Sequence, residues 1–182
     1  MSDNVDWVVD IDVPSEEAES VAQKVIVWLI EQEIIAPRFA QETSLSGNPL
    51  WVPGPNAATY SIQVRSDLNM CGLEIVAERT VFHTGGNGIP ELRCPVCEEK
   101  HTADSLPWGE YVQNWWARSG SDAMPCPACH RERSIVDWQF LDLGWGLGNL
   151  GFGFNNWAIG DSLAEAVMRI TGHRCKIVHE HI

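Results

Sequence analysis

Hydrophobic and polar residues alternate over residues 5–13. A period of two residues is typical of a β-strand, because successive side chains point to opposite faces of a sheet. The polar positions are mainly aspartates, and the apolar positions are Trp7, Val9, Ile11 and Val13. The pattern predicts a strand with one buried face.

A helical period follows this strand. Residues 14–17 predict a helix start, with Ser15 placed to cap backbone N–H groups and two glutamates suited to the helix dipole. The apolar positions then recur every three or four residues, at Ala18, Val21, Ala22, Val25, Ile26, Leu29, Ile30 and Ile34. This stripe predicts packing against a sheet, and Pro37 predicts that the helix ends by about Ile35.

Periodicity is weak over residues 37–58, where turn signals are strong. We expect a long loop, which is either a functional flap or contains a short element that the pattern hides. Trp51 is expected to anchor this loop on the core, and presentation to a partner is the alternative. Alternation resumes over residues 59–65 and 72–82, which predicts an antiparallel hairpin closed at 66–69.

The last third of the chain predicts a further strand, helix and strand. Residues 135–141 are strand-like, Asp161 or Ser162 can cap a helix that ends at Gly172, and residues 174–182 form the last strand. Without residues 86–136, this order resembles a split β-α-β arrangement. The expected fold is therefore α+β and ferredoxin-like, with an antiparallel sheet, two helices and an inserted module.

Two short cysteine motifs dominate the central segment: Cys-Pro-Val-Cys at 94–97 and, after 28 intervening residues, Cys-Pro-Ala-Cys at 126–129. Each turn brings two sulfur atoms together with little chain, and four thiolates satisfy the tetrahedral coordination of zinc. Proline presets the turn and leaves the following N–H groups free to bond the sulfurs. The predicted metal ligands are Cys94, Cys97, Cys126 and Cys129.

These turns resemble the knuckles of the zinc-ribbon family over about residues 90–135, and the resemblance implies one structural zinc ion. Such knuckles often carry glycine after the second cysteine, where this chain has Glu98 and His130. His101 and His130 are alternative ligands, but four cysteines already close a structural site. Iron in a rubredoxin-like site is the alternative metal, and a thioredoxin-like redox pair fits the two separated motifs less well.

The segment between the knuckles predicts an aromatic helix over residues 105–118, carrying Trp108, Tyr111, Val112, Trp115 and Trp116. Its tryptophans are expected to pack the zinc module against the rest of the chain, and a partner-binding surface is the alternative. The glycine run at 85–88 predicts a flexible joint. The expected organisation is a core domain of residues 1–85 and 137–182 with an inserted zinc ribbon of residues 86–136.

Composition limits the class of protein. With 45% hydrophobic and 20% charged residues, a globular fold is expected. No signal peptide is evident and the longest apolar run, residues 25–30, is too short for a membrane span, so we expect a cytoplasmic protein. In that reducing compartment the paired cysteines favour metal over disulfides, whereas the solitary Cys71 and Cys175 are expected in the core.

The net charge of −13 is unevenly distributed. Residues 86–136 carry five Lys or Arg against seven Asp or Glu, a net −2, which leaves −11 for the rest. Phosphate binding depends on Lys and Arg, so nucleic acid is a disfavoured partner. Residues 1–35 contain nine acids and only one cation, Lys24, which suits a protein partner with a basic surface.

Two further motifs carry alternative chemistry. The Gly-x-Gly-x-x-Gly spacing at 146–151 lacks the helix that a dinucleotide site requires, so a glycine-rich strand approached closely by a tryptophan or another backbone is expected. His179 and His181 share one face of the last strand and could meet Asp10 and Asp12 in a second metal site or acid–base pair. An exposed terminal strand is the favoured interpretation.

The expected function is therefore that of a non-enzymatic, zinc-containing protein that acts as an adaptor, immunity or regulatory partner of another protein. The first alternative is a metal-dependent enzyme with a site at Asp10, Asp12, His179 and His181. The second is a nucleic-acid binder that acts through the ribbon.

Overall fold

A computed structural model describes residues 4–84, 91–142 and 144–181. Its architecture is mixed α+β, as predicted, and its paired strands run antiparallel. In the described residues there are three α-helices: α1 (Ala18–Glu31), α2 (Trp108–Ala117) and α3 (Asp161–Thr171). None of these described helices is long and apolar enough to cross a membrane.

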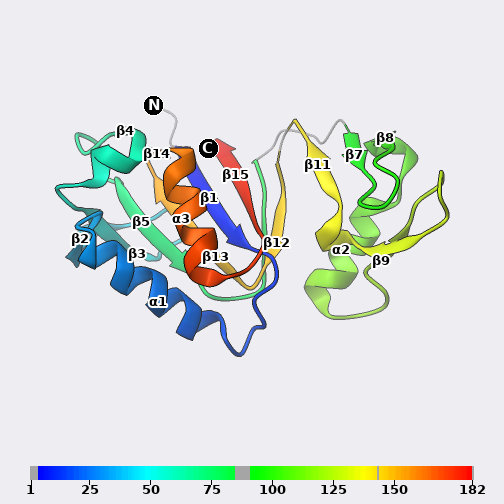
Figure 1. Cartoon of the computed structure of the whole chain (residues 1–182), viewed down its shortest axis with the longest axis horizontal. Coiled ribbons are helices and arrows are strands. Elements are labelled where there is room, and N and C mark those ends of the chain that lie inside the picture. The colour runs from blue at the N-terminus through cyan, green and yellow to red at the C-terminus, as the bar shows by residue number, and fades with distance from the viewer. Residues whose placement is uncertain (1–3, 85–90, 143, 182) are drawn as a thin grey trace.

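A six-stranded sheet forms the body of the molecule. Its strands lie in the order β15 (Cys175–His181), β1 (Asn4–Asp10), β13 (Leu150–Asn155), β5 (Gly72–Val76), β3 (Pro49–Pro53) and β2 (Ile35–Thr43). Figure 1 shows α1 and α3 together on one face of this sheet. Their apolar stripes bury residues such as Val25 and Leu163 against Phe152 and Phe154, which builds the main hydrophobic core.

The remaining strands form four small sheets in the described part of the chain. They are β11 (Gln139–Leu141), β7 (Glu91–Arg93) and β8 (Lys100–Thr102), then β9 (Ala123–Pro125) with β10 (Glu132–Ser134), β6 (Thr80–Phe82) with β12 (Gly146–Gly148), and β4 (Ser61–Val64) with β14 (Trp157–Ile159). The strands β7 to β11 and α2 lie together beside the body (Figure 1).

The first strand is buried on both faces, so the prediction of one buried face was wrong. Val8 packs in the core under the helices, whereas Trp7 and Val9 pack with Phe82 on the opposite face. This happens because α1 and α3 cover one face of the sheet at β1, whereas Phe82 of β6 and Val178 pack on the other face. The strand also ends at Asp10, three residues earlier than the alternation suggested.

The structure contains both predicted helices, but other residues than the predicted ones occupy the cap positions at some of their ends. In α1, Glu17 occupies the N-cap position without a side-chain bond, and Ser15 bonds Glu16 instead. Glu33, with a left-handed φ of 56°, follows the end of α1 at Glu31, so the helix stops before Pro37 can act. Gly172 terminates α3 in the left-handed conformation as predicted, although Gly160 occupies its N-cap position.

The expected loop over residues 37–58 contains two strands of the main sheet, β2 and β3. Their pairing is irregular, with register shifts on both sides of Phe39, and this irregularity hides the alternation. Pro37 is accommodated because β2 is an edge strand. Trp51 packs against the main core and contacts Phe39, with ring centroids 4.3 Å apart, so the anchoring role is confirmed.

The predicted hairpin of residues 59–82 was wrong, because each of its strands pairs elsewhere. β4 pairs with β14, and β5 lies between β13 and β3. Local alternation located the strands but could not identify partners that are distant in sequence.

The glycine-rich strand does allow a tryptophan to approach, as predicted. A Cβ atom on Gly153 would lie 2.6 Å from Cζ3 of Trp7, and one on Gly151 would lie 2.4 Å from Phe82. Trp7 and Phe82 contact each other, with ring centroids 4.8 Å apart, and together they cover this face of the sheet.

The predicted flexible joint lies in residues 85–90, outside the described residues. The division between a core domain and an inserted module at 86–136 therefore stays a prediction. In the described part, β11 pairs with β7, which brings residues 139–141 beside the strand that leads into the first knuckle.

We predict that Gly153→Ala lowers the free energy of unfolding by about 1–3 kcal/mol, because the new methyl group collides with a Trp7 indole that is itself packed and hydrogen-bonded. Gly109→Ala is the matched control, since a Cβ there meets nothing within 4 Å. In the first turn of α2 it should stabilise by about 0.5 kcal/mol. Chemical denaturation measures both, and an unchanged Gly153→Ala protein would contradict the packing described.

Candidate metal centre

Each cysteine motif forms the turn of a short hairpin. Residues 94–97 lie between β7 and β8, and residues 126–129 lie between β9 and β10. The two turns repeat the same backbone bonds. Cys94 N donates to Glu99 O at 3.0 Å and Cys126 N donates to Arg131 O at 2.9 Å, and the return bonds from Glu98 and His130 reach the same cysteines.

Glu98 and His130 both adopt the left-handed backbone conformation, with φ of 61° and 57°. This is the conformation for which glycine is favoured, and it explains why zinc-ribbon knuckles often have glycine at this position. The departure from the family pattern therefore changes the residue type without changing the local backbone.

The four predicted ligands come together. Their Sγ atoms all lie within 4.8 Å of one another, with 3.9 Å between Cys94 and Cys129 and 3.7 Å between Cys97 and Cys126. A tetrahedral ion with metal–sulfur bonds of 2.3 Å requires sulfurs about 3.8 Å apart. The donor set and its spacing fit a metal ion of the zinc class.

Because the four thiols lie close together, the pKa values of Cys94 and Cys97 differ. Burial opposes ionisation of Cys94, but N–H groups of Cys97 and Val96 and the neighbouring thiols lower the Cys94 pKa to about 7. At Cys97 the Glu99 backbone N–H favours the thiolate, whereas burial and the three other thiols raise the pKa to about 12. A cation placed among the sulfurs would favour the thiolate form of all four cysteines.

Two groups outside the ligand set contact the sulfur atoms. Val96 N donates to Cys94 Sγ at 3.4 Å, the type of bond that the proline turn was expected to leave available. His101 places Nε2 3.4 Å from Cys126 Sγ, so it lies beside the sulfur cluster. Such contacts orient ligands and disperse thiolate charge.

A smaller second core, which extends to Leu147 on β12, supports the knuckles. It includes Leu92, Met124 and Trp138, which are fully buried, and it includes the cysteines 94 and 126 themselves. Trp115 is buried in this core and Trp108 packs against it, as predicted for the aromatic helix. Trp116 departs from that prediction, because 55% of it is exposed.

Strand β15 holds this unit to the large sheet. Lys176 Nζ donates to the carbonyls of Val136 at 2.6 Å and Trp138 at 2.8 Å, and Arg174 pairs with Asp137 at 2.8 Å. Burial lowers the Lys176 pKa to about 8, against the opposing effect of Asp137. These bonds join residues 136–138, which follow β10, to the edge of the large sheet formed by β15.

The second predicted cluster does not form. The register of β1 and β15 sets Asp6 opposite His179 and Asp10 opposite Cys175. His179 and His181 therefore bond Asp6 and Asn4, which lie four to eight residues before the predicted acids. At about 3.3 Å per residue, this separates them by more than 10 Å.

Asp10 does meet a histidine, but it is His173, with Nδ1 2.8 Å from a fully buried carboxylate. Sequence reasoning missed His173, which only the antiparallel register of β1 and β15 could have identified. Asp12 binds Arg174, whose hydrogen bond lowers the Asp12 pKa.

The two solitary cysteines pack at the main core, as expected. Burial raises the pKa of Cys71 to about 11 and that of Cys175 to about 12, so both thiols stay protonated near neutral pH.

Comparisons of the chain with protein-family models, with curated proteins and with solved structures found no match. Fold and site together define a mixed α+β protein whose four-cysteine cluster could hold a metal ion.

We predict that Glu98→Val destabilises the metal-loaded protein by about 1–2 kcal/mol, because a β-branched residue is strained at positive φ. Glu98→Gly should leave stability unchanged or raise it by less than about 1 kcal/mol. Glu99→Val, on the neighbouring exposed residue, is the control and should change stability by less than about 0.5 kcal/mol. Thermal unfolding measures all three, and equal losses in the two valine variants would refute the left-handed assignment.

Proposed function

We propose that the four-cysteine cluster is a structural zinc site and that residues 90–135 form a zinc ribbon around it. The observation that supports this most strongly is the tetrahedral spacing of four sulfurs from two matching turns. Four protein ligands fill the coordination of zinc and leave no position for a substrate, which distinguishes structural from catalytic sites. Iron is the alternative metal for the same ligands.

In this proposal, the chain supplies the ligands and the ion supplies charge. Cys94, Cys97, Cys126 and Cys129 would hold zinc as thiolates. Zinc would link two hairpins that otherwise share only a small core, while Val96 N–H and His101 orient the sulfurs. Removal of the ion would leave like charges or protonated thiols in contact, so metal loss and local unfolding would be coupled.

We further infer a non-enzymatic role as an interaction or regulatory module for a basic protein partner. The glutamates of α1 are exposed, and Trp116 presents an aromatic side chain on the ribbon unit. The net charge of −13 disfavours the nucleic-acid alternative. The enzyme alternative has lost its geometric basis, because its histidines and aspartates lie apart. Reduced, clustered cysteines suit a cytoplasmic location.

We also propose a ferredoxin-like core with the ribbon inserted into it. In its support, four strands follow the order β15, β1, β13, β5, with α1 after β1 and α3 between β13 and β15. The β2 and β3 strands would then extend this core at the edge beyond β5.

We predict about one zinc ion per chain in protein purified without a histidine tag. The double variant Cys94→Ser, Cys126→Ser should lose this zinc, and Cys71→Ser, which alters a solitary buried cysteine, should retain it. Elemental analysis measures the metal, and circular dichroism establishes that the main sheet remains folded. A folded double variant that retains a full zinc equivalent would refute the site.

We predict that Trp116→Ala weakens partner binding about 10-fold or more, because exposed tryptophans concentrate interface energy. Phe39→Ala is the control, since Phe39 is similarly exposed, at 52%, but lies on the main sheet. Quantitative capture from native lysate compares the two variants with the unmodified protein. Equal capture by both variants would exclude Trp116 as the contact, and zinc content should be the same in all three.

A further inference from the structure

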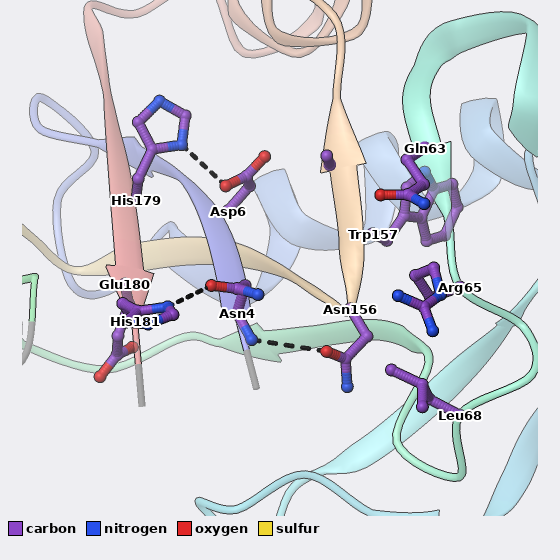
Figure 2. Close-up of a pocket in the computed structure, with 11 residues that line it drawn as sticks. Asn4, Asp6, Gln63, Arg65, Leu68, Asn156, Trp157, His179, Glu180 and His181 are labelled. Atoms are coloured by element: carbon purple, nitrogen blue, oxygen red, sulfur yellow. Dashed lines mark hydrogen bonds and ion pairs between the residues drawn. The ribbon is translucent and has the colours of Figure 1, made fainter. Parts of the chain in front are cut away.

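A polar pocket of about 330 Å³ opens between the ends of four strands of the body, away from the cysteine cluster. Figure 2 shows Gln63 and Arg65 extending from β4 and the residue after it toward Asp6 and Asn4 on β1. The opposite wall is formed by His179 to His181 of β15, and residues 156–158 complete the lining. Its volume lies within the range of small-molecule sites.

The carboxylates in and beside this pocket are already occupied. Asp6 accepts bonds on both oxygens, from His179 Nδ1 at 2.7 Å and from Ile159 N at 3.0 Å. Glu180 accepts from Trp7 Nε1 at 2.8 Å. Asp67, next to the pocket, holds Arg65 through two bonds of 3.0 and 2.9 Å. The acids are therefore held by internal donors.

Several donors remain unused within the described residues. The Gln63 amide makes no hydrogen bond there, and Arg65 uses Nε and one terminal nitrogen, which leaves Nη1. Asn4 Oδ1 pairs with His181 Nδ1, so the Nδ2 group of Asn4 points away from that histidine. The hydrogen bond with Asp6 raises the His179 pKa, against a smaller opposing effect of burial.

We propose that this pocket binds a small organic oxyanion, a carboxylate or a phosphate ester, held by Arg65, Gln63 and Asn4. An oxyanion offers several acceptors in a plane or tetrahedron that a guanidinium and amides match well. Arg65, Gln63 and Asn4 line the same pocket, so one bound oxyanion would accept hydrogen bonds from all three. The proposal goes beyond the structural zinc site and does not depend on it.

The test is a titration of the zinc-loaded protein with succinate and, separately, with glycerol phosphate, followed by amide shifts in nuclear magnetic resonance spectra. Uncharged succinamide is the ligand control. Saturable shifts confined to the pocket residues are expected with at least one anion and none with succinamide, and the anion that saturates at lower concentration identifies the class.

The variant Arg65→Gln should weaken that binding about 10-fold or more, because it removes a charge-assisted bond. Arg38→Gln makes the same charge change on the exposed edge strand β2 and should leave affinity unchanged. Zinc content and melting temperature should match in both variants, which separates this test from that of the zinc site. No saturable shift with either anion, or equal affinity in the two variants, would overturn the proposal.

Discussion

The pairing of β1 with β15 is the constraint on which most of the molecule depends. It joins residues more than 160 positions apart, and one register along it determines three separate features. At one end it sets Asn4 and Asp6 opposite His181 and His179, which builds a pocket wall. At the other end it brings His173 to the buried Asp10 and places Lys176 of β15 where it binds the carbonyl of Val136. A shift of one residue would reverse every side chain and abolish all three.

The knuckle unit depends on a different constraint, which is the closeness of its four sulfur atoms. Its core is small, and cysteines 94 and 126 are part of it. Thiolates at these distances repel one another, and protonated thiols form only weak hydrogen bonds. Neither state by itself links the two hairpins strongly. The proposed zinc ion would resolve this conflict. Because Lys176 and Arg174 bind residues 136–138, the order that such an ion imposes would extend to the main sheet.

The sequence predicted features whose causes are local. Two turns of four residues define the sulfur cluster, helical spacing locates α1 and α3, and the glycines of β13 indicate the approach of a large ring. The errors concern strand partners. The bulges around Phe39 concealed β2 and β3, and nothing within residues 59–82 reveals that β4 pairs with β14. His173 lies in a turn without periodicity, so its contact with Asp10 follows only from a register that the chain sets over long range.

The fold divides the acidic residues into a buried group and an exposed group. Asp10 is fully buried and is satisfied by His173 and by the N–H groups of Asp12 and Val13. Glu74 is 1% exposed and accepts bonds from Ser44, Asn48 and Asn155. These acids organise the interior, and buried carboxylates with full hydrogen bonding serve structure. The glutamates of α1, Glu19 and Glu31, are exposed instead, so in the proposed interaction they are the acids that a basic partner would meet.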